Sequence, residues 1–180
     1  MKLLLGVARG IDALNRMVGR LARWLILVAV LISAFNAFSR KMFDLSSNGM
    51  LEIQWYLFAA IFLLCAGYTL LNNEHVRVDV LLSRLSRRKQ LMVEIFGIVI
   101  FLMPVSLLVL ALSWQPFVDA YASGEMSSNA GGLVRWPVKL LIPAGFALLL
   151  LQAVSELIKT VDQLRRLPGQ PAATAANRQG

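Results

Sequence analysis

Charged residues are scarce in this sequence. Only 16% of its 180 residues are Asp, Glu, Lys or Arg, against roughly 25% in soluble domains, while 58% are hydrophobic. A water-soluble domain of this length needs more polar surface than these residues supply, and disorder of the main body would need low hydrophobicity. The composition excludes a large soluble catalytic domain and leaves an integral membrane protein with short loops.

Cysteine and histidine are almost absent, with one of each, Cys65 and His75. A single cysteine excludes an internal disulfide and a cysteine-based zinc site, and in its apolar run Cys65 is expected to be a packing residue. A single histidine excludes paired axial haem ligands on facing helices. The serines of the apolar runs have no base or metal-binding group near them that could activate them as nucleophiles. We therefore expect that the protein is not an enzyme and that it has no catalytic residue, no cofactor and no metal site.

Four apolar runs are long enough to cross a bilayer, which takes about 20 residues in a helix. No charged residue lies in the middle of any of them, although an ion-coupled transporter acting alone normally needs one in its pathway. Pro104 predicts a kink in the third run. The predicted fold is an all-α integral membrane protein with a membrane domain over residues 21–166 and spans at residues 21–42, 53–73, 91–118 and 138–160.

The two ends of the chain differ from this domain. Residues 1–20 are predicted to form an amphipathic arm in the membrane interface, because apolar residues recur there at helical spacing and arginines lie largely off that stripe. The alternative is that the arm is the start of a longer first helix. Residues 167–180 are small and polar without periodicity, and they predict a disordered tail.

The basic residues predict the orientation. The net charge is +8, but the cations flank the apolar runs, which indicates anionic lipid and not nucleic acid as the partner. The N-terminal segment, the second loop and the tail carry five, five and four Lys or Arg, whereas the first and third loops carry two each. By the positive-inside rule both termini are expected in the cytoplasm.

One face of the first span carries small residues at steps of four, with an asparagine beside them. Such a stripe lets helices approach closely, and an asparagine is costly to leave against lipid. We therefore expect this face to pack against another helix, in this chain or in a partner, through Ala29, Ser33, Asn36 and Ala37.

Two stretches carry a family resemblance. EIQWYLFAAIFLLCAGYTLLNNEHVRVD, residues 52–79, enters a span with an aromatic pair and leaves it through Asn73, His75, Arg77 and Asp79. SSNAGGLVRWPVKLLIPAGFALLLLQ, residues 127–152, includes an Arg-Trp-Pro triplet. Over residues 10 to 160 the chain resembles the small membrane subunit, the DctQ type, of tripartite ATP-independent periplasmic (TRAP) transporters.

The resemblance implies a scaffold or accessory subunit in a bacterial inner-membrane complex. The implied partners are a large multi-span membrane subunit, which imports organic acids on a sodium gradient, and a periplasmic substrate-binding protein. The polar exit of the second span is then expected to be an assembly elbow, formed by Asn73, His75, Arg77 and Asp79. The outer loop is a candidate docking surface for the binding protein through Glu125, Arg135 and Trp136, although the last two residues could simply anchor the fourth helix at the interface.

Two other functions remain open from the sequence. The chain could be the membrane anchor of another inner-membrane complex, or it could be an independent small transporter. Association with a large TRAP subunit would favour the TRAP subunit over the anchor of another complex. Uptake by the purified chain alone would indicate an independent transporter.

Overall fold

A computed structural model describes residues 2–43, 47–72 and 85–167. Four of its helical segments are long and apolar enough to cross a membrane. They are α1 (Lys2–Phe43), α2 (Asn48–Leu71), the continuous run Arg87–Ser123 and α6 (Trp136–Arg166). The prediction of an all-α membrane protein with four spanning helices is confirmed.

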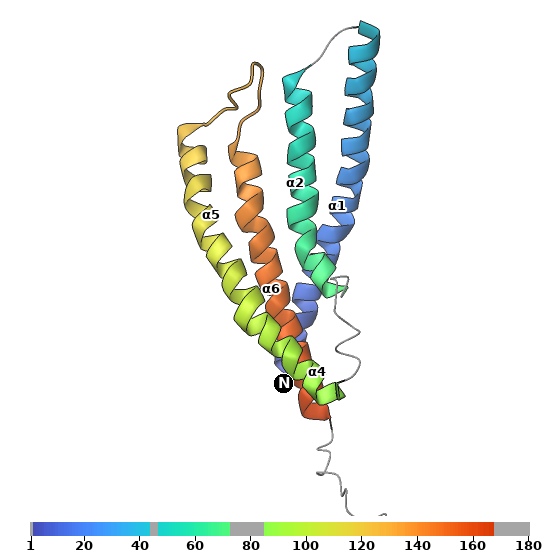
Figure 1. The fold of residues 1–180 in the computed structure, drawn as a ribbon, viewed down its shortest axis with the longest axis vertical. Helices are drawn as coiled ribbons and strands as arrows, with labels where there is room; N and C mark the ends of the chain where they lie inside the picture. Colours follow the sequence, from blue (N-terminus) through green and yellow to red (C-terminus); the bar gives the residue numbers. More distant parts are fainter. Residues whose placement is uncertain (1, 44–46, 73–84, 168–180) are drawn as a thin grey trace, which may run out of the picture.

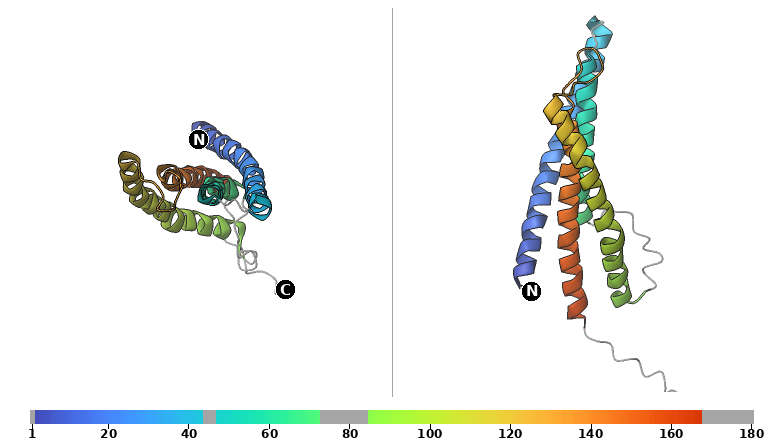
Figure 2. Two further views of the ribbon diagram at one scale, coloured as in Figure 1. Left: turned by 90° about the horizontal axis from the view of Figure 1, so that it is seen from above. Right: turned by 90° about the vertical axis from the view of Figure 1, so that its left-hand side faces the viewer.

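The helices form a narrow bundle in which α6 contacts every other helix that the structure describes. In Figure 1 the start of α1 and the end of α6 lie together at the bottom, which we call the terminal end. The segment between the last two spans lies at the top, the loop end, where Asn48 Nδ2 donates a hydrogen bond to the Ala130 carbonyl (3.1 Å). Two views turned by 90° show α5 (Met103–Ser123) packed along α6 and the start of α1 close to α6 (Figure 2).

Most of the buried apolar residues in the described chain are small. Among the buried apolar residues of the described chain, alanines predominate, while many large apolar side chains are exposed, including Leu107, Leu108 and Leu112 at more than half of their surface. This is the reverse of a soluble core. It is expected of a membrane bundle, where lipid solvates large side chains and small ones let helices approach.

Glycines permit the closest approaches. A Cβ on Gly145 of α6 would lie 2.7 Å from the Leu63 carbonyl oxygen and 2.8 Å from the Leu63 Cβ of α2. A Cβ on Gly19 of α1 would lie 2.5 Å from the Tyr68 ring. Neither position has room for a side chain larger than hydrogen, so glycine at these two positions lets α2 pack closely against α1 and α6.

The first helix runs unbroken from Lys2 to Phe43. At 1.5 Å per residue its 42 residues are about 63 Å long, about twice the hydrocarbon thickness. The first half of α1 packs against the rest of the bundle, including α6. Its buried residues there are Ala8, Asp12, Asn15 and Gly19. The placement of residues 1–20 in the membrane interface stays a prediction.

The third span is interrupted as its proline suggests. After α4 (Arg87–Phe96), a six-residue π-helix, η1 (Gly97–Leu102), leads directly into α5, in which Pro104 is in the first turn. Proline has no N–H, and its ring crowds the carbonyl four residues earlier, here that of Ile100. The wider turns of η1 lie just before Pro104, where the regular α-helical hydrogen bonds between residues i and i−4 cannot continue.

Candidate functional site

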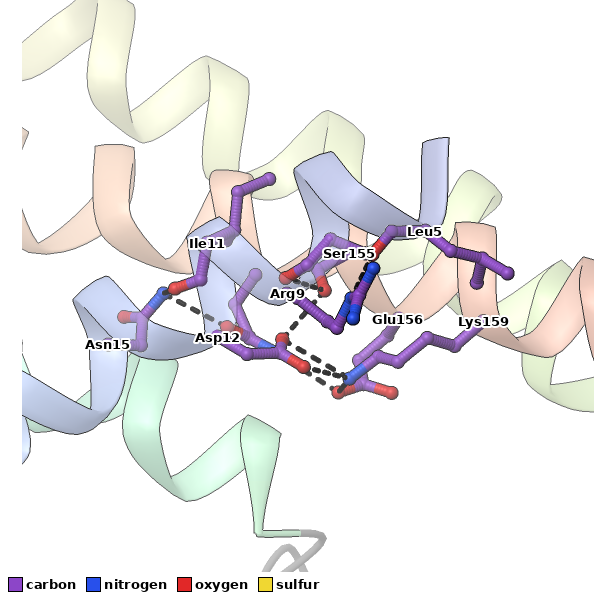
Figure 3. A network of polar contacts seen from close by, with 10 residues as sticks. Leu5, Arg9, Ile11, Asp12, Asn15, Ser155, Glu156 and Lys159 are labelled. Carbon is purple, nitrogen blue, oxygen red and sulfur yellow. Dashed lines mark hydrogen bonds and ion pairs between the residues drawn. The ribbon is translucent and has the colours of Figure 1, made fainter. Parts of the chain in front are cut away.

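A cluster of polar residues joins α1 to α6 near the terminal end (Figure 3). Two carboxylates, one ammonium group, two amides and one hydroxyl meet between the helices. Four of these side chains come from α6, at positions 152, 155, 156 and 159, and this spacing places them on one face of the helix. We call this set the terminal cluster: Asp12, Asn15, Gln152, Ser155, Glu156 and Lys159.

Asp12 is the centre of the terminal cluster, and it is 7% exposed. Its Oδ1 accepts hydrogen bonds from Ser155 Oγ (2.7 Å) and Gln152 Nε2 (2.9 Å). Lys159 Nζ lies 3.1 Å from its Oδ2. A carboxylate removed from water is tolerated when it is paired and its lone pairs are satisfied, as they are here.

A second carboxylate shares these donors. Glu156 Oε1 accepts from Lys159 Nζ (2.7 Å) and from Gln152 Nε2 (3.1 Å). Lys159 therefore lies between two carboxylates from different helices and reduces the repulsion between them. The arrangement connects helices and offers no free base or nucleophile.

Asn15 extends the contact to a third helix. Its Nδ2 donates to Gln152 Oε1 (3.0 Å), whereas its buried Oδ1 has no hydrogen-bond partner. That oxygen faces Gly67 of α2, where a Cβ would lie only 2.3 Å away. The side chain thus fills the gap between α1, α2 and α6 at the level of the terminal cluster.

A second polar contact lies at the loop end. Glu52, in the first turns of α2, accepts from the Leu133 N–H (2.7 Å), from Asn129 Nδ2 (2.7 Å) and from Ser127 Oγ. The Tyr56 hydroxyl, one turn further along, donates to the Val134 carbonyl (3.2 Å). These bonds fix the loop before α6 onto the start of α2.

Glu125 forms an ion-pair group with the start of α6. It binds Lys139 Nζ and Arg135 Nη1, the latter at 3.0 Å. The hydrogen bonds from Lys139 and Arg135 hold the pKa of Glu125 below its usual range. A depressed carboxyl pKa means that any stability from this group is present at neutral pH and is lost only as the pH falls through the lowered value.

The structure brings the predicted docking residues together, since Arg135 pairs with Glu125 and Trp136 packs edge-on against Tyr121 with ring centroids 5.5 Å apart. The Arg135 side chain keeps 48% of its surface exposed. These contacts are compatible with a helix anchor and with a presented surface, and the docking role stays a prediction.

The predicted packing face of the first span divides between two environments. Ala29 and Asn36 are buried inside this chain, Ser33 is half-buried and Ala37 is exposed. Asn36 Oδ1 is buried without a hydrogen-bond partner. The assembly elbow of Asn73, His75, Arg77 and Asp79 lies outside the described residues.

Within the described part of the chain, no three His, Cys, Asp or Glu side chains are grouped as metal ligands. The sequence reasoning missed the terminal cluster and the role of Glu52. A signal existed for the cluster, because Gln152, Ser155, Glu156 and Lys159 form a polar stripe at helical spacing. A buried polar stripe opposite Asp12 indicates contact between two helices.

The fold and these sites define a small multi-spanning membrane protein whose described polar groups join its own helices and loops. Its family follows from comparison with known proteins. A family model described as tripartite ATP-independent periplasmic transporters, DctQ component, matches residues 29–163, and the chain belongs to this family. No curated protein and no solved structure matches the chain.

Proposed function

We propose that this chain, a small membrane subunit of a TRAP transporter, acts as a scaffold for a large multi-span membrane subunit. In the proposal the large subunit imports an organic acid on a sodium gradient, and a periplasmic binding protein delivers it. The chain itself catalyses no reaction.

The placement of ionisable groups carries this proposal. The apolar parts of the four spans, such as Trp24–Ser39 and Ile95–Val118, contain no charged residue. Of the described carboxylates that approach the helix contacts, Asp12 is bonded to a neighbouring helix, Glu52 to a neighbouring loop, and Glu156 to Gln152 and Lys159 of its own helix. An ion pathway needs accessible ionisable or carbonyl groups within the membrane, and scaffolding needs none.

Transport measurements test the proposal. We expect the chain to co-purify with a large TRAP subunit, and we expect proteoliposomes holding both, with binding protein outside, to take up substrate only under a sodium gradient. Omitting any one component, or collapsing the gradient, should abolish uptake. Uptake by vesicles that contain this chain alone would contradict the scaffold role.

We further propose that the terminal end faces the cytoplasm of a bacterial inner membrane. The cation asymmetry supports this orientation, and the contact of Asp12 with Lys159 agrees with both termini being on one side. Reporter fusions after Ser47 and Asn129 are expected to give periplasmic signals, and fusions after Ser86 and Gly169 cytoplasmic ones. A cytoplasmic signal at Asn129 would contradict the orientation.

A further inference from the structure

One side of α1 near the terminal end is cationic, and the described residues place no counter-charge against it. Arg9, Arg16, Arg20 and Arg23 follow each other at steps of seven, four and three residues, and all are exposed. Asp12 is the sole acid of this helix, and it is turned inward, where the terminal cluster binds it. Within the described residues no carboxylate pairs with these arginines, so the burial of Asp12 leaves their charge available.

A hollow of about 470 Å³ lies on this side of α1. Arg20, Arg23, Trp24 and Leu27 line it, at the spacing of one helix face. The hollow lies where the uncharged run Trp24–Ser39 begins, so its first half is cationic and its second half is apolar. A ligand that fits both halves has an anionic head and a hydrocarbon chain.

We propose that this hollow binds the headgroup of an anionic phospholipid, with the phosphodiester between Arg20 and Arg23. Guanidinium groups bind phosphate oxygens through charge-assisted hydrogen bonds. Trp24, which is 68% exposed, has the amphipathic ring that favours the headgroup level of a bilayer, and Leu27 beyond it contacts the acyl chain. The site goes beyond the proposed transport function, because neither substrate nor coupling ion is involved.

The surroundings favour lipid over an acidic protein segment. Ile26, Val28 and Leu31, which follow the arginines on α1, are all more than 40% exposed, so the hollow opens onto an apolar, membrane-facing surface. An acidic peptide would satisfy the arginines but not this surface. A single phospholipid satisfies both.

The test uses the full chain in neutral detergent, with Trp55, Trp114 and Trp136 changed to Phe so that Trp24 is the only indole. Brominated phosphatidylglycerol and brominated phosphatidylcholine are added separately, and quenching of Trp24 fluorescence is measured. Each cation near an anionic lipid surface strengthens binding about fivefold. With two arginines in the site, we therefore expect phosphatidylglycerol to reach half-quenching at an about 25-fold lower mole fraction than phosphatidylcholine.

Two charge-matched double variants distinguish a site from general surface charge. Arg20→Gln/Arg23→Gln should bring the two lipids within about twofold of each other, whereas Arg88→Gln/Lys89→Gln, which removes the same charge from α4, should keep the preference. Circular dichroism confirms that both variants fold. Equal quenching by the two lipids in the Trp24-only chain that keeps Arg20 and Arg23, or equal loss of preference in both double variants, would overturn the proposal.

A soluble competitor separates lipid from free phosphate. Glycerol phosphate presents the same anionic group without acyl chains, and we expect it to leave the quenching by phosphatidylglycerol unchanged. Displacement of the lipid at equal concentration would show a site for small phosphates and would overturn the assignment to phospholipid.

Discussion

Replacing Lys159 with methionine is expected to lower the free energy of unfolding by about 2 kcal/mol. Without the ammonium group, Asp12 and Glu156 keep only neutral donors between them. Breaking a fully buried pair costs about 3–5 kcal/mol, and the 27% exposure of the Lys159 side chain reduces that figure. Unfolding of the full chain in mixed micelles, followed by circular dichroism, measures the difference.

A double-mutant cycle shows whether the loss belongs to the pair. Asp12→Leu/Lys159→Met should be more stable than the sum of the two single changes predicts, because in the double variant neither Asp12 nor Lys159 is left without the other, while Glu156 loses its ammonium partner equally in the double variant and in Lys159→Met. Lys89→Met is the matched control, since Lys89 is an exposed lysine near the same end, and it should change stability little. Strict additivity of the two single variants would contradict a direct interaction between Asp12 and Lys159.

Gly145→Ala is expected to destabilise the bundle by about 2 kcal/mol. The added methyl group would overlap the backbone carbonyl of Leu63, which cannot move without shifting α2. The same unfolding measurement tests this.

Gly10→Ala provides the contrast for the glycine test. A Cβ on Gly10 of α1 meets nothing within 4 Å, so this variant should be neutral or gain up to about 1 kcal/mol from helix propensity. If Gly145→Ala were as stable as Gly10→Ala, the close approach of α6 to α2 would be wrong.

The sequence alone predicts the spanning helices but not the polar contacts between them. Long uncharged runs predict spans directly, and the family motifs around Trp55 and Arg135 lie in the segment that the family match covers. In the local sequence pattern, Asp12 is only one more charge in the amphipathic segment at residues 1–20. Its partners Gln152 and Ser155 in α6 are 140 and 143 residues away, beyond the range of any local pattern.

The break in the third span was predicted in place but not in form. Pro104 indicates where the hydrogen-bond ladder fails. Which repair follows depends on the neighbours, and here η1 widens while contacting α6. Similarly, the sequence around Glu52 indicates only an acidic residue at the start of a helix. Its loop partners, Asn129 and Leu133, follow only from the fold.

The bonds of Glu52 also impose an order on biogenesis. Its partners are made 75 to 81 residues later, so after synthesis of α2 this carboxylate has water as its only ligand until the loop emerges. The start of α2 must therefore stay at the aqueous surface while the third span is inserted. Asp12 gains its partners later still, when α6 has been synthesised. Glu52 gains its partners once the loop before α6 is in place, whereas Asp12 gains its partners only with α6, so a chain that ends before α6 leaves at least one of these two carboxylates without them.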